Sequence, residues 1–212
     1  GARAEIARRA GREIIVTMIA DKDLEKARAL ADSNVIVTGN AHEITTNPDI
    51  DIVVELIGGQ TIAKDLILEA LAHGKHVVTA NKALLANHGT EIFAAARAKG
   101  VIIAFEAAVA GGIPIIKALR EGLTANRITW IAGIINGTSN FILSEMREKG
   151  LSFEQVLAEA QKLGYAEADP TYDIEGIDAA HKITLMSAIA FGIPVQFSKV
   201  YTEGITKLTG ED

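Results

Sequence analysis

Cysteine is absent from the 212 residues, so disulfides and thiolate metal sites are excluded, and a reducing compartment fits the composition. Long apolar runs are also absent. Every apolar run is interrupted before it reaches the roughly 18 residues expected of a membrane-spanning helix. Residues 1–13 lack the apolar segment of a secretory signal. We therefore expect a globular, cytoplasmic protein with no membrane partner.

Positive charge is in short supply, because 21 lysines and arginines face 27 aspartates and glutamates, for a net charge of -6. A nucleic-acid-binding protein needs a basic face for phosphate contacts, so we expect no nucleic-acid partner. Hydrophobic residues make up 49% of the chain, which is enough for a substantial core in one large or two small domains. Small molecules are the expected partners.

Residues 14–105 alternate short β-branched runs with helical patterns, which is typical of a parallel sheet built from βαβ units. We therefore predict an α/β fold in which residues 1–105 form an incomplete, doubly wound, Rossmann-type nucleotide-binding domain. The predicted strands are Ile14–Ala20, Val35–Thr38, Ile52–Glu55, His76–Thr79 and Ile102–Phe105, and the predicted helices are Ala2–Ala10, Asp23–Ala31, Ile62–Ala72 and Glu91–Lys99.

The glycine-rich phosphate-binding turn that opens such a domain, G-x-G-x-x-G, is missing. A charged helical stretch stands in its place, and Gly1 alone carries no weight as the last glycine of such a turn. The last dozen residues show no clear closing element. These features favour the interpretation that the chain is a fragment.

Residues 106–212 change in character and predict an incomplete domain of α+β type that follows the sheet. The glycine-rich loop after Phe105 leads into a helix and then into a strand, and three helices follow. Ser152 and Gln155 form the pattern of a capping box, and Thr138 is expected to start the helix before it. The predicted elements are a helix over Pro114–Glu121, a strand over Arg127–Ile135, and helices over 138–150, 152–163 and 176–191.

Ligands of open α/β sheets bind beyond the carboxyl ends of the strands, where three polar segments are expected. Asp21–Asp23 fits an adenosine ribose or a helix cap. Gly58 and Gly59 allow close approach of a cofactor, and a plain tight turn explains them equally well. Asn81 and Lys82 would point into the same crevice, although a lysine at a helix start is usually a surface charge.

Two further loops have a functional and a structural interpretation. The apolar loop from Glu106 to Pro114 exposes carbonyl oxygens that suit a hard cation, but the residues alone favour an interdomain hinge. The turn over Asn136, Gly137 and Thr138 has amides that fit a carboxylate. An Asn-Gly turn with a threonine cap accounts for the same residues without a ligand.

The densest polar cluster runs from Gly164–Pro170 through Asp173 to Lys182. Asp178 and Lys182 are four residues apart on one helix face and can pair. Such a pair is often an ordinary surface contact of little energy. Here the apolar residues beyond Lys182 favour partial burial, and burial beside a fixed acid is how an enzyme tunes an ammonium for proton transfer.

Taken together, these segments resemble homoserine dehydrogenases in identity, order and spacing over essentially the whole chain. The strings are Glu55–Gly59 (ELIGG), Thr79–Lys82 (TANK), Phe105–Pro114 (FEAAVAGGIP), Gly133–Asn140 (GIINGTSN), Gly164–Pro170 (GYAEADP) and Glu175–Lys182 (EGIDAAHK).

The resemblance implies the interconversion of L-aspartate 4-semialdehyde and L-homoserine with NADP or NAD, in threonine and methionine biosynthesis. Lys182 matches the family's general acid/base and Lys82 a second lysine near the reacting centre, while Asp178 orients or balances Lys182. Alternative hypotheses are a related NAD(P)-dependent oxidoreductase acting on another small carbonyl compound, and a noncatalytic binding fragment.

The resemblance also implies a monovalent cation (Na⁺) site, and a homodimer or higher homo-oligomer formed through residues 106–212. The cation interpretation overturns the hinge preferred from the residues alone. The implied residues are Glu167, Asp173, Gly137 and Thr138 for substrate, Gly58, Gly59, Asn81, Lys82 and Gly164 for cofactor, and Glu106, Val109, Gly111 and Ile113 for the cation.

Overall fold

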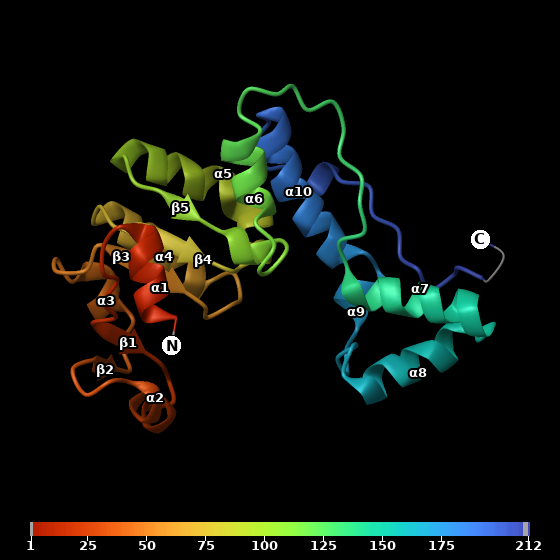
Figure 1. The fold of residues 1–212 in the computed structure, drawn as a ribbon, viewed down its shortest axis with the longest axis horizontal. Coiled ribbons are helices and arrows are strands. Elements are labelled where there is room, and N and C mark those ends of the chain that lie inside the picture. Colours follow the sequence, from red (N-terminus) through yellow and green to blue (C-terminus); the bar gives the residue numbers. More distant parts are fainter. Residues whose placement is uncertain (1, 210–211) are drawn as a thin grey trace.

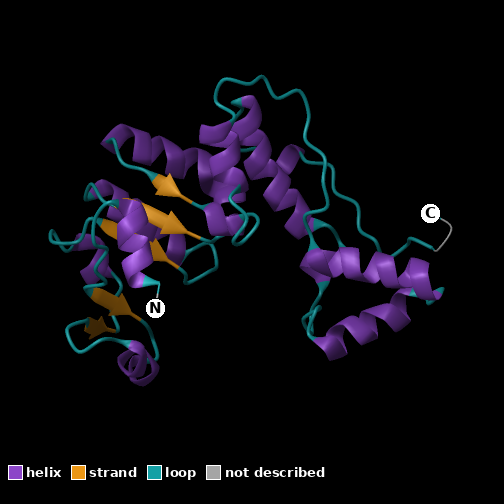
Figure 2. Cartoon of the chain, in the orientation of Figure 1, coloured by secondary structure: helices purple, strands orange, loops and turns teal. Residues whose placement is uncertain are grey.

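The computed structural model describes residues 2–209 and 212, so the expectation for Gly1 lies outside the described residues. Figure 1 shows a lobe that carries the strands, a second lobe formed by α7 and α8, and the long helix α10 between them. Figure 2 shows that all the strands lie in the first lobe. The strands are β1 (Met18–Ala20), β2 (Ile36–Thr38), β3 (Ile52–Glu55), β4 (His76–Thr79) and β5 (Ile103–Ala104).

The strands form two parallel sheets, which confirms the α/β class. The larger sheet has the order β3-β4-β5, and its register pairs Ile52 with His76 and Glu55 with Thr79. The strands β1 and β2 form a separate pair, with Met18 opposite Ile36. Because the strands are parallel, the carboxyl ends of β3 and β4 lie side by side at one edge.

The first predicted strand was too long. Only Met18–Ala20 belongs to β1, because the ladder begins where β2 begins, with Met18 opposite Ile36. The preceding Ile14, Ile15 and Val16 have β propensity, but they lie outside the ladder and are exposed. In the same way, β5 retains only two of the four residues predicted for it.

The helices of the first lobe follow the sequence pattern with two exceptions. The five-residue α3 was missed because it is too short to show a helical period. Helix α5 is twice as long as predicted. The prediction began the helix after Gly89, but this glycine lies inside the helix, where Phe93 and Val195 leave little room for a side chain. The helices are α1 (Arg3–Ala10), α2 (Leu24–Leu30), α3 (His42–Thr46), α4 (Ile62–Ala72) and α5 (Lys82–Lys99).

The second half contains helices but no strand within residues 106–209, so the strand predicted over Arg127–Ile135 is wrong. This segment lacks a regular element and leaves Trp130 and Ile134 exposed, because no described strand runs beside it to pair with its β-branched residues. The helical elements are η1 (Glu106–Ala108), α6 (Ile115–Lys117), a π-helical turn η2 (Ala118–Gly122), α7 (Gly137–Lys149), α8 (Phe153–Leu163), α9 (Thr171–Ile174), α10 (Ile177–Phe191) and η3 (Phe197–Lys199).

The two lobes have separate hydrophobic cores. The larger one lies between the β3-β4-β5 sheet, α4 and α5, and it includes Leu185 and Met186 from the second half of α10. The smaller one packs Ile142 of α7 against Val156 of α8. The capping box predicted for α8 is present, with Ser152 and Gln155 bonded to each other's backbone N–H groups. Among the described residues, no helix is both long and apolar enough to span a membrane.

Candidate active site

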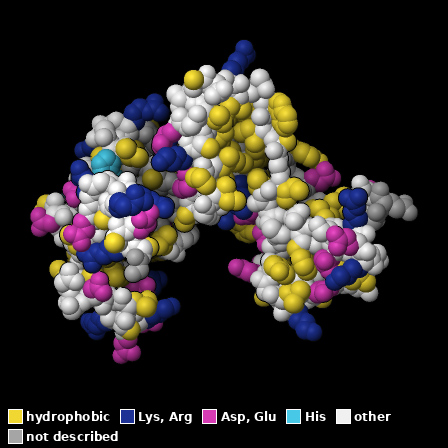
Figure 3. All heavy atoms as spheres, in the orientation of Figure 1, with side chains coloured by type: hydrophobic (Ala, Val, Ile, Leu, Met, Phe, Trp, Pro, Cys, Tyr) yellow, Lys and Arg dark blue, Asp and Glu magenta, His cyan; other side chains and the backbone are white. Residues whose placement is uncertain are grey.

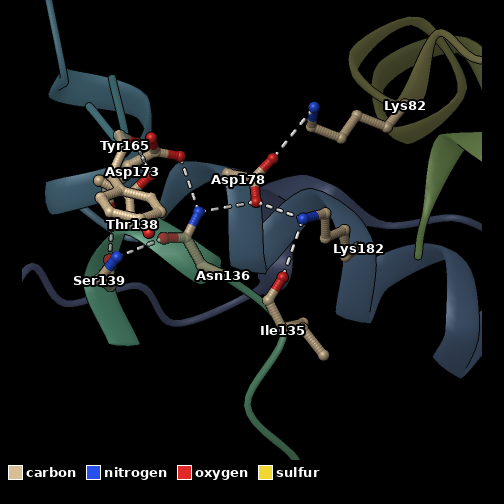
Figure 4. Close-up of polar contacts among 9 residues, drawn as sticks. All are labelled: Lys82, Ile135, Asn136, Thr138, Ser139, Tyr165, Asp173, Asp178 and Lys182. Carbon is tan, nitrogen blue, oxygen red and sulfur yellow. Dashed lines mark hydrogen bonds and ion pairs between the residues drawn. The ribbon is translucent and has the colours of Figure 1, made fainter. Parts of the chain in front are cut away.

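One carboxylate on α10 holds two ammonium groups from distant parts of the chain. Oδ2 of Asp178 lies 2.7 Å from Nζ of Lys182, one helical turn further on. Oδ1 of Asp178 lies 3.0 Å from Nζ of Lys82, the first residue of α5. Nζ of Lys182 also donates a 2.8 Å hydrogen bond to the carbonyl oxygen of Ile135. Figure 4 shows Asp178 between the two lysines.

The three side chains differ in how much water reaches them. The side chain of Asp178 is 8% exposed, that of Lys182 17% and that of Lys82 35%. The pairing of Asp178 with Lys182, and the partial burial of Lys182, are therefore confirmed. The contact with Lys82 was not predicted. It places a second positive charge on a carboxylate that is shielded from solvent.

Asp178 stays ionised in this setting. Burial by itself would raise the pKa of Asp178, but hydrogen bonds from Lys182, Asn136 and Lys82 outweigh it and hold the pKa below the ordinary value. A carboxyl with a lowered pKa carries no proton at neutral pH. Asp178 is therefore suited to fix and balance the lysines, and the lysines are the groups that can carry a proton.

Asn136 is a site residue for which the sequence suggested only a turn. Its Nδ2 donates to Oδ1 of Asp173 at 2.7 Å and to Oδ2 of Asp178 at 2.9 Å. Its Oδ1 accepts the backbone N–H of Ser139 at 2.7 Å and so caps α7. The helix cap is therefore Asn136, two residues before the expected Thr138. Asn-Gly before a helix carried the capping signal, but nothing local pointed to the two acids.

The first turn of α7 faces the same region. The Thr138 hydroxyl donates to the carbonyl oxygen of Tyr165 at 2.8 Å, and the Ser139 hydroxyl donates to that of Asp173 at 3.0 Å. The N–H groups of Gly137 and Thr138 stand before the first intrahelical donor and have no acceptor among the described residues, so they are available to an anion. The ring of Tyr165 stacks on Phe141, which braces this side of the site.

The remaining predicted substrate and cofactor residues of the second lobe are only partly joined to this cluster. Asp173 is half-buried and bonded to Asn136. Glu167 lies exposed in the loop after α8, where its carbonyl oxygen accepts from Gln161, and no contact within the described chain ties its carboxylate to Asp178. Gly164 ends α8 in the left-handed conformation, with open space around it.

The predicted cofactor residues of the first lobe form a connected edge beyond β3 and β4. Gly58 and Gly59 both have positive φ, and no atom lies within 4 Å of a side chain built on either, so the turn is open to a ligand. Nδ2 of Asn81 donates to the carbonyl oxygen of Gly59 at 2.6 Å, and its Oδ1 caps α5. Asn81 therefore ties the glycine turn to the helix that begins with Lys82.

The acids after β1 have a structural role. Asp23 caps α2 by accepting the N–H of Lys26 at 3.0 Å, and Oδ1 of Asp21 accepts the N–H of Asp23 at 2.8 Å. This confirms the interpretation of the segment as a helix cap. All three residues of the segment are exposed, so the cap leaves the neighbouring Lys22 free to contact a ligand.

In the loop after β5, the carboxylate of Glu106 binds backbone N–H groups and is not free to bind a metal ion. Both carboxylate oxygens of Glu106 accept N–H groups of α6, from Ile116 at 2.7 Å and Lys117 at 2.9 Å. In the part of the chain that the structure describes, no hydrogen-bond donor reaches the carbonyl oxygens of Val109 and Gly111. Two free carbonyls in a loop suit a hard cation, so the chemistry fits carbonyl ligation and not carboxylate ligation.

His181 is a buried titratable residue beside the cluster. It is 2% exposed, its Nδ1 is the one buried side-chain nitrogen or oxygen atom without a hydrogen-bond partner among the described residues, and its ring packs against those of Tyr172 and Phe197. Burial lowers its pKa, the charge of Lys82 lowers it further, and Asp178 opposes both only weakly. The imidazole is therefore neutral at neutral pH.

We expect the neutrality of His181 to make stability depend on pH. The unfolded chain binds a proton near pH 6.5 and the folded chain only at lower pH, so this contribution to stability is present above about pH 6.5 and declines as the pH falls further. In His181→Phe, which keeps an aromatic ring, urea denaturation at pH 7 and pH 5 should show a smaller difference than in the parent. An equal difference in both proteins would show that His181 protonates freely.

Two family models together match most of the chain. The model described as homoserine dehydrogenase, NAD binding domain, matches residues 3–106, and the model described as homoserine dehydrogenase matches residues 114–212. A homoserine dehydrogenase from Pseudomonas aeruginosa is 66% identical over 209 residues, which cover 98% of this chain and 48% of that protein. One from Bacillus subtilis is 45% identical over 202 residues, covering 95% of this chain and 47% of that protein.

Solved structures show the same likeness. The crystal structure of a homoserine dehydrogenase from Thiobacillus denitrificans superposes with a TM-score of 0.93 at 69% identity, covering 99% of this chain and 48% of that one. A hyperthermophilic archaeal homoserine dehydrogenase in complex with NADPH superposes with a TM-score of 0.81 at 28% identity, covering 98% and 70%. The chain spans about half the length of the bacterial relatives, and it belongs to the homoserine dehydrogenase family.

Proposed function

We propose that the chain supplies the lysine pair, the substrate site and part of the cofactor site of an NAD(P)-dependent homoserine dehydrogenase, which interconverts L-aspartate 4-semialdehyde and L-homoserine. The observation that carries this proposal is the single carboxylate of Asp178 held between Lys82 and Lys182. Residues 1–105 would be the nucleotide-binding part, and residues 106–212 the part for catalysis and subunit contacts.

Lys182 is the proposed general acid/base. It gives a proton to the carbonyl oxygen of the semialdehyde as that becomes a hydroxyl, and it takes the proton back in the reverse direction. Two fixed contacts hold its Nζ, one to Asp178 and one to the carbonyl oxygen of Ile135, whereas Nζ of Lys82 has one contact. A positioned group transfers a proton more effectively than a mobile one. Lys82 adds a second positive charge that favours negative charge on the reacting oxygen.

The substrate's carboxylate and ammonium groups would be bound by the second lobe. The free N–H groups of Gly137 and Thr138 at the start of α7 suit the carboxylate, because a helix N-terminus attracts anions. Asp173, held by Asn136, and the exposed Glu167 suit the ammonium. Figure 4 shows Thr138 and Asp173 on one side of Asn136 and the two lysines on the other, so an amino acid bound beside Thr138 and Asp173 would reach the lysines with its other end.

The cofactor would lie along the edge beyond β3 and β4, with Gly58, Gly59, Asn81 and Lys82 on one side and Gly164 on the other. The glycine turn fits a nucleotide, because there is open space where the Cβ atoms of Gly58 and Gly59 would be. NADP or NAD, when bound, supplies the hydride chemistry of the reaction. The archaeal relative with NADPH bound supports this choice.

Three further features belong to the same proposal. A monovalent cation, Na⁺, would bind the loop of Glu106, Val109, Gly111 and Ile113 through backbone oxygens. The complete protein would act in the cytoplasm, in threonine and methionine biosynthesis. It would assemble as a homodimer or a higher homo-oligomer.

The test uses a complete enzyme in which this chain replaces the matching segment of the Pseudomonas aeruginosa relative. We expect this hybrid enzyme to oxidise L-homoserine with NADP⁺ or NAD⁺, followed by the absorbance of the reduced nicotinamide. Other small hydroxy acids serve as controls, and turnover of one of them in place of homoserine would indicate a related oxidoreductase. A folded hybrid enzyme that binds cofactor but turns over none of these substrates would contradict an enzymatic role for the chain.

A further inference from the structure

We propose that Thr79 and Glu55 form a positioning pair that sets the glycine turn of residues 56–60 and the catalytic Lys82 as one unit. The inference rests on the proposed function, because it concerns the cofactor edge of the same site. Neither residue is among those that the sequence or the resemblance singled out for a role. Both are the last residues of their strands, and they lie opposite each other in the β3-β4 register.

Glu55 is a buried carboxylate that accepts three hydrogen bonds. The residue is 4% exposed. Its Oε1 accepts the backbone N–H groups of Ile57 at 2.7 Å and Gly58 at 3.1 Å. Its Oε2 accepts the hydroxyl of Thr79 at 2.6 Å. A charge-assisted acceptor of this kind fixes the turn from beneath, since both amides must point inward to reach it.

Thr79 connects that carboxylate to the neighbouring loop. It is 1% exposed, and its hydroxyl oxygen accepts the backbone N–H of Asn81 at 3.0 Å while donating to Glu55. Asn81 in turn bonds the carbonyl oxygen of Gly59 and caps α5, whose first residue is Lys82. The contacts therefore close a ring from Glu55 through the glycine turn, Asn81 and Thr79 back to Glu55.

The position of this ring argues for a role beyond packing. Neither Glu55 nor Thr79 reaches solvent, so neither can touch a substrate. The residues that they hold directly or through Asn81 lie in the glycine turn of residues 56–60 or in the first turn of α5, which begins with Lys82. A displacement of about 1 Å in a positioned group can cost on the order of a hundredfold in rate. The pair is therefore placed to adjust cofactor binding and turnover together.

The decisive variants are Thr79→Val, which removes the hydroxyl at nearly constant shape, and Thr79→Ser, which keeps it. Thr45→Val is the matched control, since Thr45 is also 1% exposed and its hydroxyl likewise donates to a carboxylate, that of Glu69, with the carbonyl oxygen of His42 as a second contact, away from the site. In the hybrid enzyme, Thr79→Val should weaken NADPH binding and lower kcat, each about tenfold, because it removes the buried hydrogen bonds of the hydroxyl to Glu55 and Asn81. The KM for homoserine should stay within about twofold of the parent.

Thr79→Ser should recover most of both effects, and Thr45→Val should show neither. NADPH binding is measured by fluorescence titration, so the pair can be tested even if the hybrid enzyme does not oxidise homoserine, an outcome that would contradict only the proposed function. If Thr79→Val does not fold, Glu55→Gln replaces it, and weaker NADPH binding is again expected. A Thr79→Val or Glu55→Gln enzyme that binds NADPH like Thr45→Val would overturn the positioning role.

Discussion

Lys182→Ala in the hybrid enzyme should lower kcat for homoserine oxidation by about a hundredfold or more, because it removes the positioned proton carrier. The fold should persist. Asp178 keeps its contacts with Lys82 and Asn136 in this variant, so the buried carboxylate is still paired. Steady-state rates and a urea denaturation curve measure the two expectations together.

The control for Lys182→Ala is Lys207→Ala, which removes an exposed lysine from the same half of the chain. We expect it to leave both the rate and the denaturation curve close to those of the parent. Near-normal turnover in Lys182→Ala would refute its role as the acid/base. If Lys82→Ala then abolished turnover in its place, the proton would be carried by Lys82.

Asp178→Asn should affect turnover and stability at the same time. The asparagine keeps the size of the side chain but leaves the ammonium groups of Lys82 and Lys182 side by side without their shared counter-charge. Breaking a buried ion pair costs about 3–5 kcal/mol. Because Lys82 is about one-third exposed and partly screened by water, we expect a smaller loss of about 2 kcal/mol in the free energy of unfolding. Turnover should fall about a hundredfold.

The pH dependence provides a second measurement on Asp178→Asn. The folded pKa of Asp178 is lowered, so the carboxylate stabilises the fold above about pH 4, and this contribution is lost as the pH falls through the folded pKa. The variant should therefore lose less stability on acidification than the parent. Asp32→Asn, at an exposed position, is the control. Equal acid sensitivity in parent and variant would show that the lysines do not hold Asp178.

Local signals in the sequence predicted the elements and contacts that depend on neighbouring residues. The capping box of Ser152 and Gln155 fixed the start of α8, and the spacing of Asp178 and Lys182 fixed their pairing on one helix face. The strands β3 and β4 have the predicted bounds, since their short β-branched runs end at clear turns. Each of these features is decided within a few residues of chain.

The missed features all depend on partners far away in the sequence. Asn136 joins two acids that reach it only because α9 packs against both α7 and α10, and Lys82 meets Asp178 only because α5 packs on α10. The pattern of Arg127–Ile135 has strand propensity, but propensity does not supply a neighbouring strand. The resemblance to homoserine dehydrogenases identified the candidate site residues, and the fold shows which of them are in contact.

The packing of α10 divides the candidate site between two parts of the molecule, because α10 belongs to the large core and α7 to the small one. The second half of α10 is embedded in the large core with Leu185 and Met186, so Asp178, Lys182 and Lys82 are carried by the same packed body as the sheet. Figure 3 shows a hollow between that body and the lobe of α7 and α8. A change in the angle between the two lobes would therefore move α7 and α8 and leave the spacing of the lysine pair unchanged. Asn136 connects the two parts, since its Oδ1 caps α7 and its Nδ2 donates to Asp178 of α10.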